Sequence, residues 1–282
     1  MCIRDRNNIV TAIVPHSEMG QGVGTALAQM LAEELDADWS LVKYEEAPAV
    51  REFANYPIIK GMFIGNTDVP DFVVPTIDGA LIRTAKALDL QITGGSSSIR
   101  MTGEFGMRVA GAAVKEMLRD AAAIKWQVPV DEITTENSHL IHVKSGRQIP
   151  YSDVAQAVSN MVPPASPKLK STDDFKIIGK SVARFDLPSK VDGTALFAID
   201  VKLPDMLYAT VQRAPSFTGQ IDTITDKVSR SIKGIVDIVR LPSTTVSSAL
   251  GSFSFSDSVA VVADSFWTAK KGMDLLLSLI HI

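Results

Sequence analysis

The sequence is poor in cysteine. Cys2 is the single cysteine among 282 residues, and it lies in a terminal segment that we set aside below. A lone cysteine excludes an internal disulfide framework and a thiolate metal cluster, and with Cys2 set aside no cysteine nucleophile is expected. This shortage leaves the cellular compartment open.

Strong charge of either sign and long apolar runs are also lacking. The net charge is −4, and the lysines and arginines are scattered, which argues against a nucleic-acid partner. No run approaches the roughly 20 uninterrupted apolar residues of a membrane-spanning helix, so we expect no transmembrane segment. With 46% hydrophobic and 21% charged residues, the composition is that of an ordinary globular protein of roughly two domains.

Both ends of the chain resemble translated sequencing-adapter sequence. MCIRDR at residues 1–6 and LSLIHI at residues 277–282 match translations of the two strands of a common transposon end. A match at each terminus is hard to attribute to coincidence, so we expect both segments to be artefacts and exclude them from fold reasoning. The native N-terminus is then expected to be missing, which leaves an export signal undecided.

The first half of the chain predicts a strand, a glycine-containing loop and a helix in succession. Residues 8–14 alternate as in a strand, residues 15–22 form the loop, and apolar residues recur at helical spacing from Leu27 to Leu35. Residues 92–98, with two glycines and three serines, are expected to be irregular. Further predicted elements are a strand at 41–47, a helix at 77–90, an Ala-rich helix ending near Trp126, a strand pair at 133–136 and 139–143, and a short helix at 152–161 capped by Ser152.

A proline-rich segment at residues 162–174 is the clearest linker, and we place a domain boundary there. Beyond it the pattern changes to short strands, followed by a helix. The predicted elements are strands at 195–201, 206–212, 235–241 and 259–262, and a helix at 266–276. The sequence therefore predicts a mixed α/β (α+β) fold in two parts.

Two loops have residues suited to binding a ligand. In the first, Gly20 and Gly22 flank Gln21 before a helix, where free N–H groups and the helix dipole favour phosphate. The second, at 94–98, offers small side chains, N–H groups and hydroxyls. Neither loop matches the Walker pattern or G-x-G-x-x-G, so from the residues alone each is either a phosphate cradle or a plain turn.

Motifs across most of the chain resemble the molybdopterin-binding large subunits of the xanthine dehydrogenase and aldehyde oxidase family, and within it the isoquinoline 1-oxidoreductase beta-subunit group. In the first part the motifs are Glu18-Met19-Gly20-Gln21-Gly22 with Thr25, Thr93-Gly94-Gly95-Ser96-Ser97-Ser98-Ile99-Arg100, and Arg108 with Ala110, Gly111 and Ala112. In the second part they are Arg184, Asp186-Leu187-Pro188, Lys190-Val191-Asp192-Gly193 and the stretch at 259–267. Residues 58–90 look like an insertion, and Ser97 stands where threonine is common in the family.

The resemblance implies a partial molybdopterin-binding domain at 7–161 and, after the linker, a truncated hammerhead-like α/β domain at 175–276. It implies that the cofactor contacts are Met19, Gly20, Gln21, Gly22, Gly94, Gly95, Ser96, Ser97 and Ser98. The family's catalytic glutamate belongs to a later segment, so no catalytic residue and no protein metal ligand is expected in this chain. We therefore expect this chain to be inactive on its own.

For the intact protein, the resemblance implies a molybdenum hydroxylase that oxidises N-heterocycles or aldehydes with oxygen from water. The implied cofactor is molybdenum-molybdopterin in the cytosine dinucleotide form, and a small partner subunit with [2Fe–2S] clusters would accept the electrons. Relatives are often exported, which points to the periplasm. The alternatives are a non-catalytic cofactor-binding or scaffold relative and a nucleotide-phosphate binding module.

Several other residues invite a functional interpretation that the sequence does not favour. His139 and His142 lie three apart on a predicted strand and should point to opposite faces, as surface histidines rather than metal ligands. Asp36 and Asp38 lack the glycine and distal glutamate of a calcium loop. Glu18 is expected to order its loop by hydrogen bonding, not to act as a base. Packing roles are expected for Trp39, Trp126 and Trp267.

Overall fold

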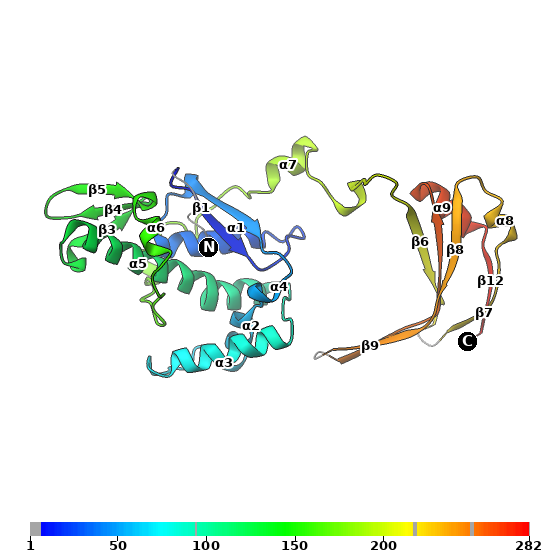
Figure 1. Ribbon diagram of the computed structural model, residues 1–282, viewed down its shortest axis with the longest axis horizontal. Helices are drawn as coiled ribbons and strands as arrows, with labels where there is room; N and C mark the ends of the chain where they lie inside the picture. The colour runs from blue at the N-terminus through cyan, green and yellow to red at the C-terminus, as the bar shows by residue number, and fades with distance from the viewer. Residues whose placement is uncertain (1–6, 94, 217–218, 249–250, 282) are drawn as a thin grey trace. The chain divides into compact units, whose positions relative to one another are not determined.

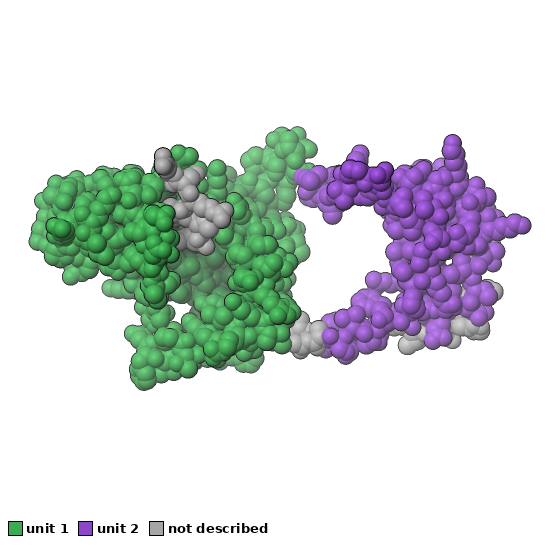
Figure 2. Space-filling model, viewed as in Figure 1, with its two compact units in different colours: residues 1–195 green, residues 196–282 purple. Residues whose placement is uncertain are grey.

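The computed structural model describes residues 7–93, 95–216, 219–248 and 251–281. The chain forms two compact units, unit 1 at residues 1–195 and unit 2 at residues 196–282 (Figure 2). Each unit combines helices with small sheets, so the predicted mixed α/β class is confirmed.

Unit 1 is built around a strand–helix–strand element. β1 (Val10–Val14) and β2 (Val42–Glu46) pair in parallel, and α1 (Val23–Leu35) connects them (Figure 1). Alternate residues of β1 are buried, and α1 buries its apolar side chains in the same core. A parallel pair needs such a crossover, which places the loop at residues 15–22 at the carboxyl end of β1.

The long helix α5 (Val109–Trp126) packs against α1 and ends where the sequence predicted. Gly111 allows the close approach, because a Cβ there would lie 2.5 Å from the carbonyl oxygen of Leu31. The helical turn α4 (Gly95–Ser97) and the π-helix η3 (Ser98–Arg108) precede α5. The expectation of an irregular segment through residue 98 is therefore wrong from Gly95 onward. A π-helix is rare and occurs often at functional sites.

The remaining elements of unit 1 surround this core. They are η1 (Trp39–Leu41), η2 (Arg51–Phe53), α2 (Tyr56–Phe63), α3 (Val74–Ala87), η4 (Val130–Glu132), β3 (Ile133–Glu136), β4 (His139–His142), β5 (Arg147–Pro150), η5 (Tyr151–Asp153), α6 (Ala155–Val158), η6 (Thr172–Asp174) and α7 (Leu187–Asp192). The strands β3, β4 and β5 form an antiparallel sheet. The predicted Ser152 cap is wrong, because a 3-10 turn at Tyr151–Asp153 precedes α6, which has no side-chain cap.

The segment at 58–90, which resembles an insertion, forms α2 and α3 and returns close to its starting point. The N–H of Asn55 donates to the carbonyl of Leu90 at 2.7 Å. The two ends of the segment therefore lie next to each other, so the segment leaves and rejoins unit 1 at one place.

The predicted linker continues into a stretch that packs on α1 through two fully buried carboxylates. Glu33 accepts hydrogen bonds from the N–H groups of Lys176, Ile177 and Ile178 at 2.6–3.0 Å, and Glu34 accepts one from the N–H of Lys170. The division into compact units falls at Ala195, so the chain after the predicted linker remains part of unit 1 up to that residue.

Unit 2 contains a three-stranded antiparallel sheet with β11 (Ser258–Ala263) between β6 (Tyr208–Arg213) and β8 (Ile235–Leu241). β11 is almost entirely buried, and α9 (Phe266–Asp274), capped by Ser265, packs on this sheet. The other elements are η7 (Ala198–Asp200), α8 (Lys227–Arg230), and the strand pairs β7 (Gln220–Thr225) with β12 (Leu277–His281) and β9 (Thr244–Ser248) with β10 (Gly251–Phe255). β12 lies within the segment expected to be adapter-derived.

The predicted strand at 195–201 is wrong. The structure has a 3-10 turn there, in which the Asp200 carboxylate accepts a hydrogen bond from the N–H of Phe197 at 3.0 Å. A short acidic side chain that bonds nearby main chain competes with strand pairing. Within the described ranges, no helix combines the length and apolar character needed to cross a membrane.

Candidate functional site

The first candidate loop joins β1 to α1 and depends on glycine at two positions. Gly20 has φ 100° and Gly22 has φ 80°, in the left-handed region that other residues rarely adopt. Gly22 is also the residue that precedes the first turn of α1. The two glycines therefore let the chain turn sharply from strand to helix.

Glu18 orders this loop, as the sequence predicted. Its Oε1 accepts hydrogen bonds from the N–H groups of Gly20 and Gly22, both at 2.9 Å, and its Oε2 accepts one from Gly24 at 3.3 Å. The side chain is only 6% exposed. Its negative charge lies at the positive end of the α1 dipole. The free N–H groups that we expected for phosphate at this helix start are thus occupied by Glu18 itself, because the carboxylate is an internal anion.

Gln21 uses both ends of its amide within the loop. Its Oε1 accepts from the N–H of Met19 at 2.5 Å, and its Nε2 donates to the carbonyl of Ser17 at 2.9 Å. An amide oxygen has a second lone pair and an amide nitrogen has a second hydrogen. The exposed Gln21 can therefore both shape the turn and offer one further acceptor and donor to a ligand.

The second candidate loop begins beside the first. The Oγ1 of Thr93 accepts a hydrogen bond from the N–H of Ser17 at 2.9 Å. Gly94, one of the predicted contacts, lies outside the described residues. Gly95 has φ 47°, Ser96 and Ser97 are exposed, and Ser98 is buried at the start of the π-helix. Tertiary structure therefore joins the two loops, which are more than 70 residues apart in sequence.

A buried polar cluster that the sequence did not indicate connects the first loop to the π-helix that follows the second loop. The Nε2 of His16 lies 2.8 Å from the Oγ1 of Thr102, which belongs to the π-helix, and accepts from the Nδ2 of Asn55 at 3.1 Å. Asn55 also donates to Thr102 at 3.0 Å. Burial lowers the pKa of His16 below its ordinary value, and the buried Nδ1 of its ring has no hydrogen-bond partner among the described residues.

Arg184, which follows the predicted linker in the sequence, contacts the first loop. Its Nη1 donates to the carbonyl of Gly20 at 2.7 Å and its Nη2 donates to Glu18 at 3.2 Å. Asp186 holds the same guanidinium through two hydrogen bonds of 2.9 and 2.7 Å. The hydrogen bond from Arg184 keeps the pKa of the Asp186 carboxyl well below its usual range, despite partial burial that opposes this. Arg184 is part of the family motif quoted above, but only the tertiary structure shows its contact with the loop.

The exposed side chains of the two loops, namely the Gln21 amide and the Ser96 and Ser97 hydroxyls, suit contact with a ligand, whereas Glu18 already binds the N–H groups of Gly20 and Gly22. A Cβ added at Gly20, Gly22 or Gly95 would meet no atom within 4 Å, so the backbone is open to close approach. Met19 is 69% exposed beside them. No group of three or more His, Cys, Asp or Glu residues suited to a metal ion occurs in the part of the chain that the structure describes.

Residues for which no chemical role was predicted have mainly structural roles. His142 is buried, bonded to Glu132 at 2.9 Å and to Ser145 at 2.6 Å, so its prediction as a surface histidine is wrong. Trp39 packs against Phe185, as expected. Trp267 is 62% exposed and lies beneath the Lys271 ammonium, so the expected packing role is wrong for this residue.

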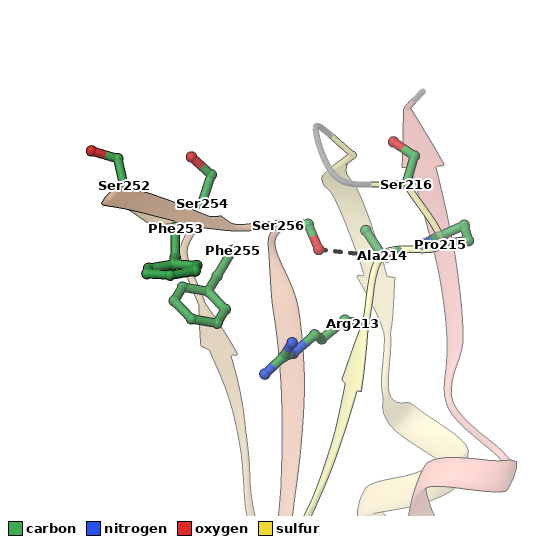
Figure 3. A pocket seen from close by; sticks show the side chains of 9 residues that line it. All are labelled: Arg213, Ala214, Pro215, Ser216, Ser252, Phe253, Ser254, Phe255 and Ser256. Atoms are coloured by element: carbon green, nitrogen blue, oxygen red, sulfur yellow. Dashed lines mark hydrogen bonds between the residues drawn. The ribbon is translucent and has the colours of Figure 1, made fainter. Parts of the chain in front are cut away.

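Unit 2 has an open groove of about 560 Å³ between the end of β6 and the β10 strand (Figure 3). The Arg213 guanidinium lies 5.2 Å from the centre of the Phe255 ring, and Ser256 donates to the Ala214 carbonyl at 3.5 Å. The rest of the lining is serine, alanine, proline and phenylalanine. Among the nine lining residues, Arg213 is the one charged side chain, so this groove lacks the groups for acid–base chemistry.

Comparison with known proteins relates the chain to oxidoreductase subunits. It is 28% identical over 270 residues to isoquinoline 1-oxidoreductase subunit beta of Brevundimonas diminuta, which covers 84% of this chain and 31% of that protein. It is 29% identical over 277 residues to the membrane-bound aldehyde dehydrogenase [pyrroloquinoline-quinone] of Gluconacetobacter polyoxogenes, covering 95% of this chain and 30% of the relative. No family model matches the chain.

A shorter match bears directly on the cofactor. Over 62 residues, 22% of this chain and 15% of the relative, the chain is 39% identical to the nicotinate dehydrogenase large molybdopterin subunit of Eubacterium barkeri. The resemblance to molybdopterin-containing oxidoreductases that the motifs predicted is therefore confirmed. The chain spans about a third or less of the length of these relatives.

Proposed function

We propose that this chain is the part of a molybdenum hydroxylase large subunit that supplies two cofactor-binding loops. The residues that would hold the molybdopterin cofactor are Met19–Gly22 and, in the second loop, residues 94–98. The observation that carries this proposal is the hydrogen bond between Ser17 and Thr93, which holds the two loops together where their glycines leave the backbone open. Gln21 would orient the cofactor through its remaining amide donor and acceptor.

When bound, the cofactor supplies the redox chemistry, while the protein supplies placement and electrostatics. The substrates would be N-heterocycles or aldehydes, with the oxygen taken from water. The cofactor would be the cytosine dinucleotide form, and a small [2Fe–2S] subunit would accept the electrons. The chain on its own would be inactive, since the proposed catalytic glutamate would belong to a later segment of the intact subunit.

Residues 7–161 would belong to the molybdopterin-binding domain and 175–276 to the hammerhead-like domain.

Purification of the full-length gene product that contains these residues tests the proposal. We expect stoichiometric molybdenum by elemental analysis and a pterin fluorophore after acid oxidation. The relative named for pyrroloquinoline quinone makes that quinone the second candidate. A protein with bound quinone and without molybdenum would replace our proposal with the quinone alternative, and a protein with neither group would refute both.

A further inference from the structure

Four hydrogen bonds of the Arg184 side chain link two distant parts of unit 1. Two of them reach the first loop, at the Gly20 carbonyl and the Glu18 carboxylate. The other two go to the Asp186 carboxylate. A planar guanidinium can serve a bidentate carboxylate and two further acceptors at once, whereas a lysine ammonium is a point donor with three hydrogens.

The segment that carries Arg184 is itself anchored on α1. The N–H of Phe185 donates to the buried Oγ1 of Thr25 at 3.1 Å, and the Phe185 ring packs 5.1 Å from Trp39 and 5.7 Å from Tyr44. Lys190 forms an ion pair with Asp186 one turn further along α7. These contacts fix the position of the Arg184 guanidinium independently of its hydrogen bonds to the loop.

The loop needs this external contact for two physical reasons. Its glycines lose more conformational entropy on ordering than any other residue type. In addition, the Glu18 side chain is only 6% exposed, and a buried carboxylate without a cation is costly. Arg184 supplies the positive charge at Glu18 and a hydrogen bond at Gly20.

We propose that Arg184 is a positioning residue that sets the Met19–Gly22 loop in its cofactor-binding conformation. The inference rests on the proposed function and adds to it: the loop would depend on a segment more than 160 residues away in sequence and beyond the predicted linker. A positioning role for Arg184 also explains the spacing of Arg184, Asp186 and Lys190. Asp186 accepts two hydrogen bonds from the arginine, and Lys190 forms an ion pair with Asp186.

Hydrogen exchange of the loop amides tests this directly. We expect Arg184→Ala to speed exchange at Gly20, Gly22 and Gly24 by about tenfold or more, because their bonds to Glu18 open more often. Exchange in the centre of α5 should stay as in the wild type. The matched control is Arg51→Ala, which removes a bidentate pair with Asp89 at the surface of the same unit. It should leave the loop amides unchanged.

Arg184→Lys separates the guanidinium geometry from its charge. Lysine keeps the charge but cannot make the four bonds together, so we expect the loop amides of Arg184→Lys to exchange faster than in the wild type. If Arg184→Ala is too unstable to measure, Arg184→Lys provides the same test in a variant that keeps the charge. Unchanged loop exchange in Arg184→Ala, or full protection in Arg184→Lys, would overturn the inference.

Cofactor content distinguishes this inference from the proposed function. In the full-length protein, Arg184→Ala should lower the molybdenum-to-protein ratio while Arg51→Ala keeps it. If the wild type itself lacks molybdopterin, the proposed function fails, and loop exchange still reports whether Arg184 holds the loop. If the wild type is loaded and Arg184→Ala is equally loaded, the inference alone fails.

Discussion

The N–H of Ser17 donates a hydrogen bond to the Oγ1 of Thr93 at 2.9 Å, and this bond joins the two candidate loops. Thr93→Val keeps the shape of the side chain and removes the acceptor. We expect unit 1 to lose about 1 kcal/mol of stability, with reduced molybdenum content in the full-length protein. Thr84→Val is the control, because Thr84 makes an exposed hydrogen bond on α3, away from both loops. Equal molybdenum content in the two variants would show that the coupling of the loops has no role in cofactor binding.

Gln21→Ala tests the proposed contact with the cofactor. The side chain is exposed, so we expect the melting temperature of the cofactor-free protein to change little, while molybdenum content and activity fall. Gln21→Glu keeps an acceptor for Met19 but loses the donor to Ser17, which separates the two ends of the amide. The role fails if Gln21→Ala is fully loaded with molybdenum and turns over like the wild type. A lowered melting temperature with normal loading would instead make Gln21 a turn residue alone.

Glu33→Ala should be among the most damaging single changes in unit 1. It strands the three main-chain N–H groups that Glu33 now binds at 2.6–3.0 Å, and it leaves the Lys170 ammonium with Asp36 as its carboxylate partner. We expect a loss of about 3–5 kcal/mol, measured by urea denaturation. Glu116→Ala is the control, since Glu116 accepts one exposed main-chain bond from Lys168. Similar losses in the two variants would contradict the anchoring role of Glu33.

Glu33 should also make stability depend on pH. Burial raises the pKa of its carboxyl, but the bonds from Lys170 and from the N–H groups of Ile177 and Ile178 outweigh burial and lower the pKa below its ordinary value of 4.5. A carboxyl with a lower pKa in the folded state stabilises fully above the unfolded value and loses this contribution as the pH falls through the folded value. We therefore expect Glu33→Gln to lose less stability than the wild type as the pH falls below the ordinary carboxyl pKa of 4.5. Equal losses of stability in the wild type and in Glu33→Gln as the pH falls would refute the assignment of this pH dependence to Glu33.

Gly111→Ala should prevent α5 from approaching α1. The new methyl group would lie 2.5 Å from the Leu31 carbonyl and 3.0 Å from the Cβ of Glu34. We expect a loss of about 1–3 kcal/mol. Gly79→Ala on α3 meets only the end of the Arg83 side chain, at 3.8 Å, and should stabilise by up to about 1 kcal/mol through helix propensity. Thermal denaturation should give a lower melting temperature for Gly111→Ala and a higher one for Gly79→Ala than for the wild type. Stabilisation by Gly111→Ala would disprove the close packing.

Local patterns were sufficient to predict much of the fold. Apolar periodicity located α1 and α5, alternation located β1, and a short apolar run located β11, because each of these elements buries a regular face or a whole strand. The same patterns failed where a short polar side chain redirects the backbone, as Asp200 does at the predicted strand 195–201. They also failed for the π-helix, whose distinct hydrogen bonding leaves no simple period in the sequence.

The sequence by itself determined the two glycine loops, the ordering role of Glu18 and the family resemblance, because these depend on residues that are neighbours in the chain. Only the tertiary structure decided what holds the loops together. Ser17 and Thr93, His16 and Thr102, and Arg184 and Gly20 are separated by 76, 86 and 164 residues, respectively. Such pairs leave no local pattern, since they meet only after β1, α1 and the π-helix have packed.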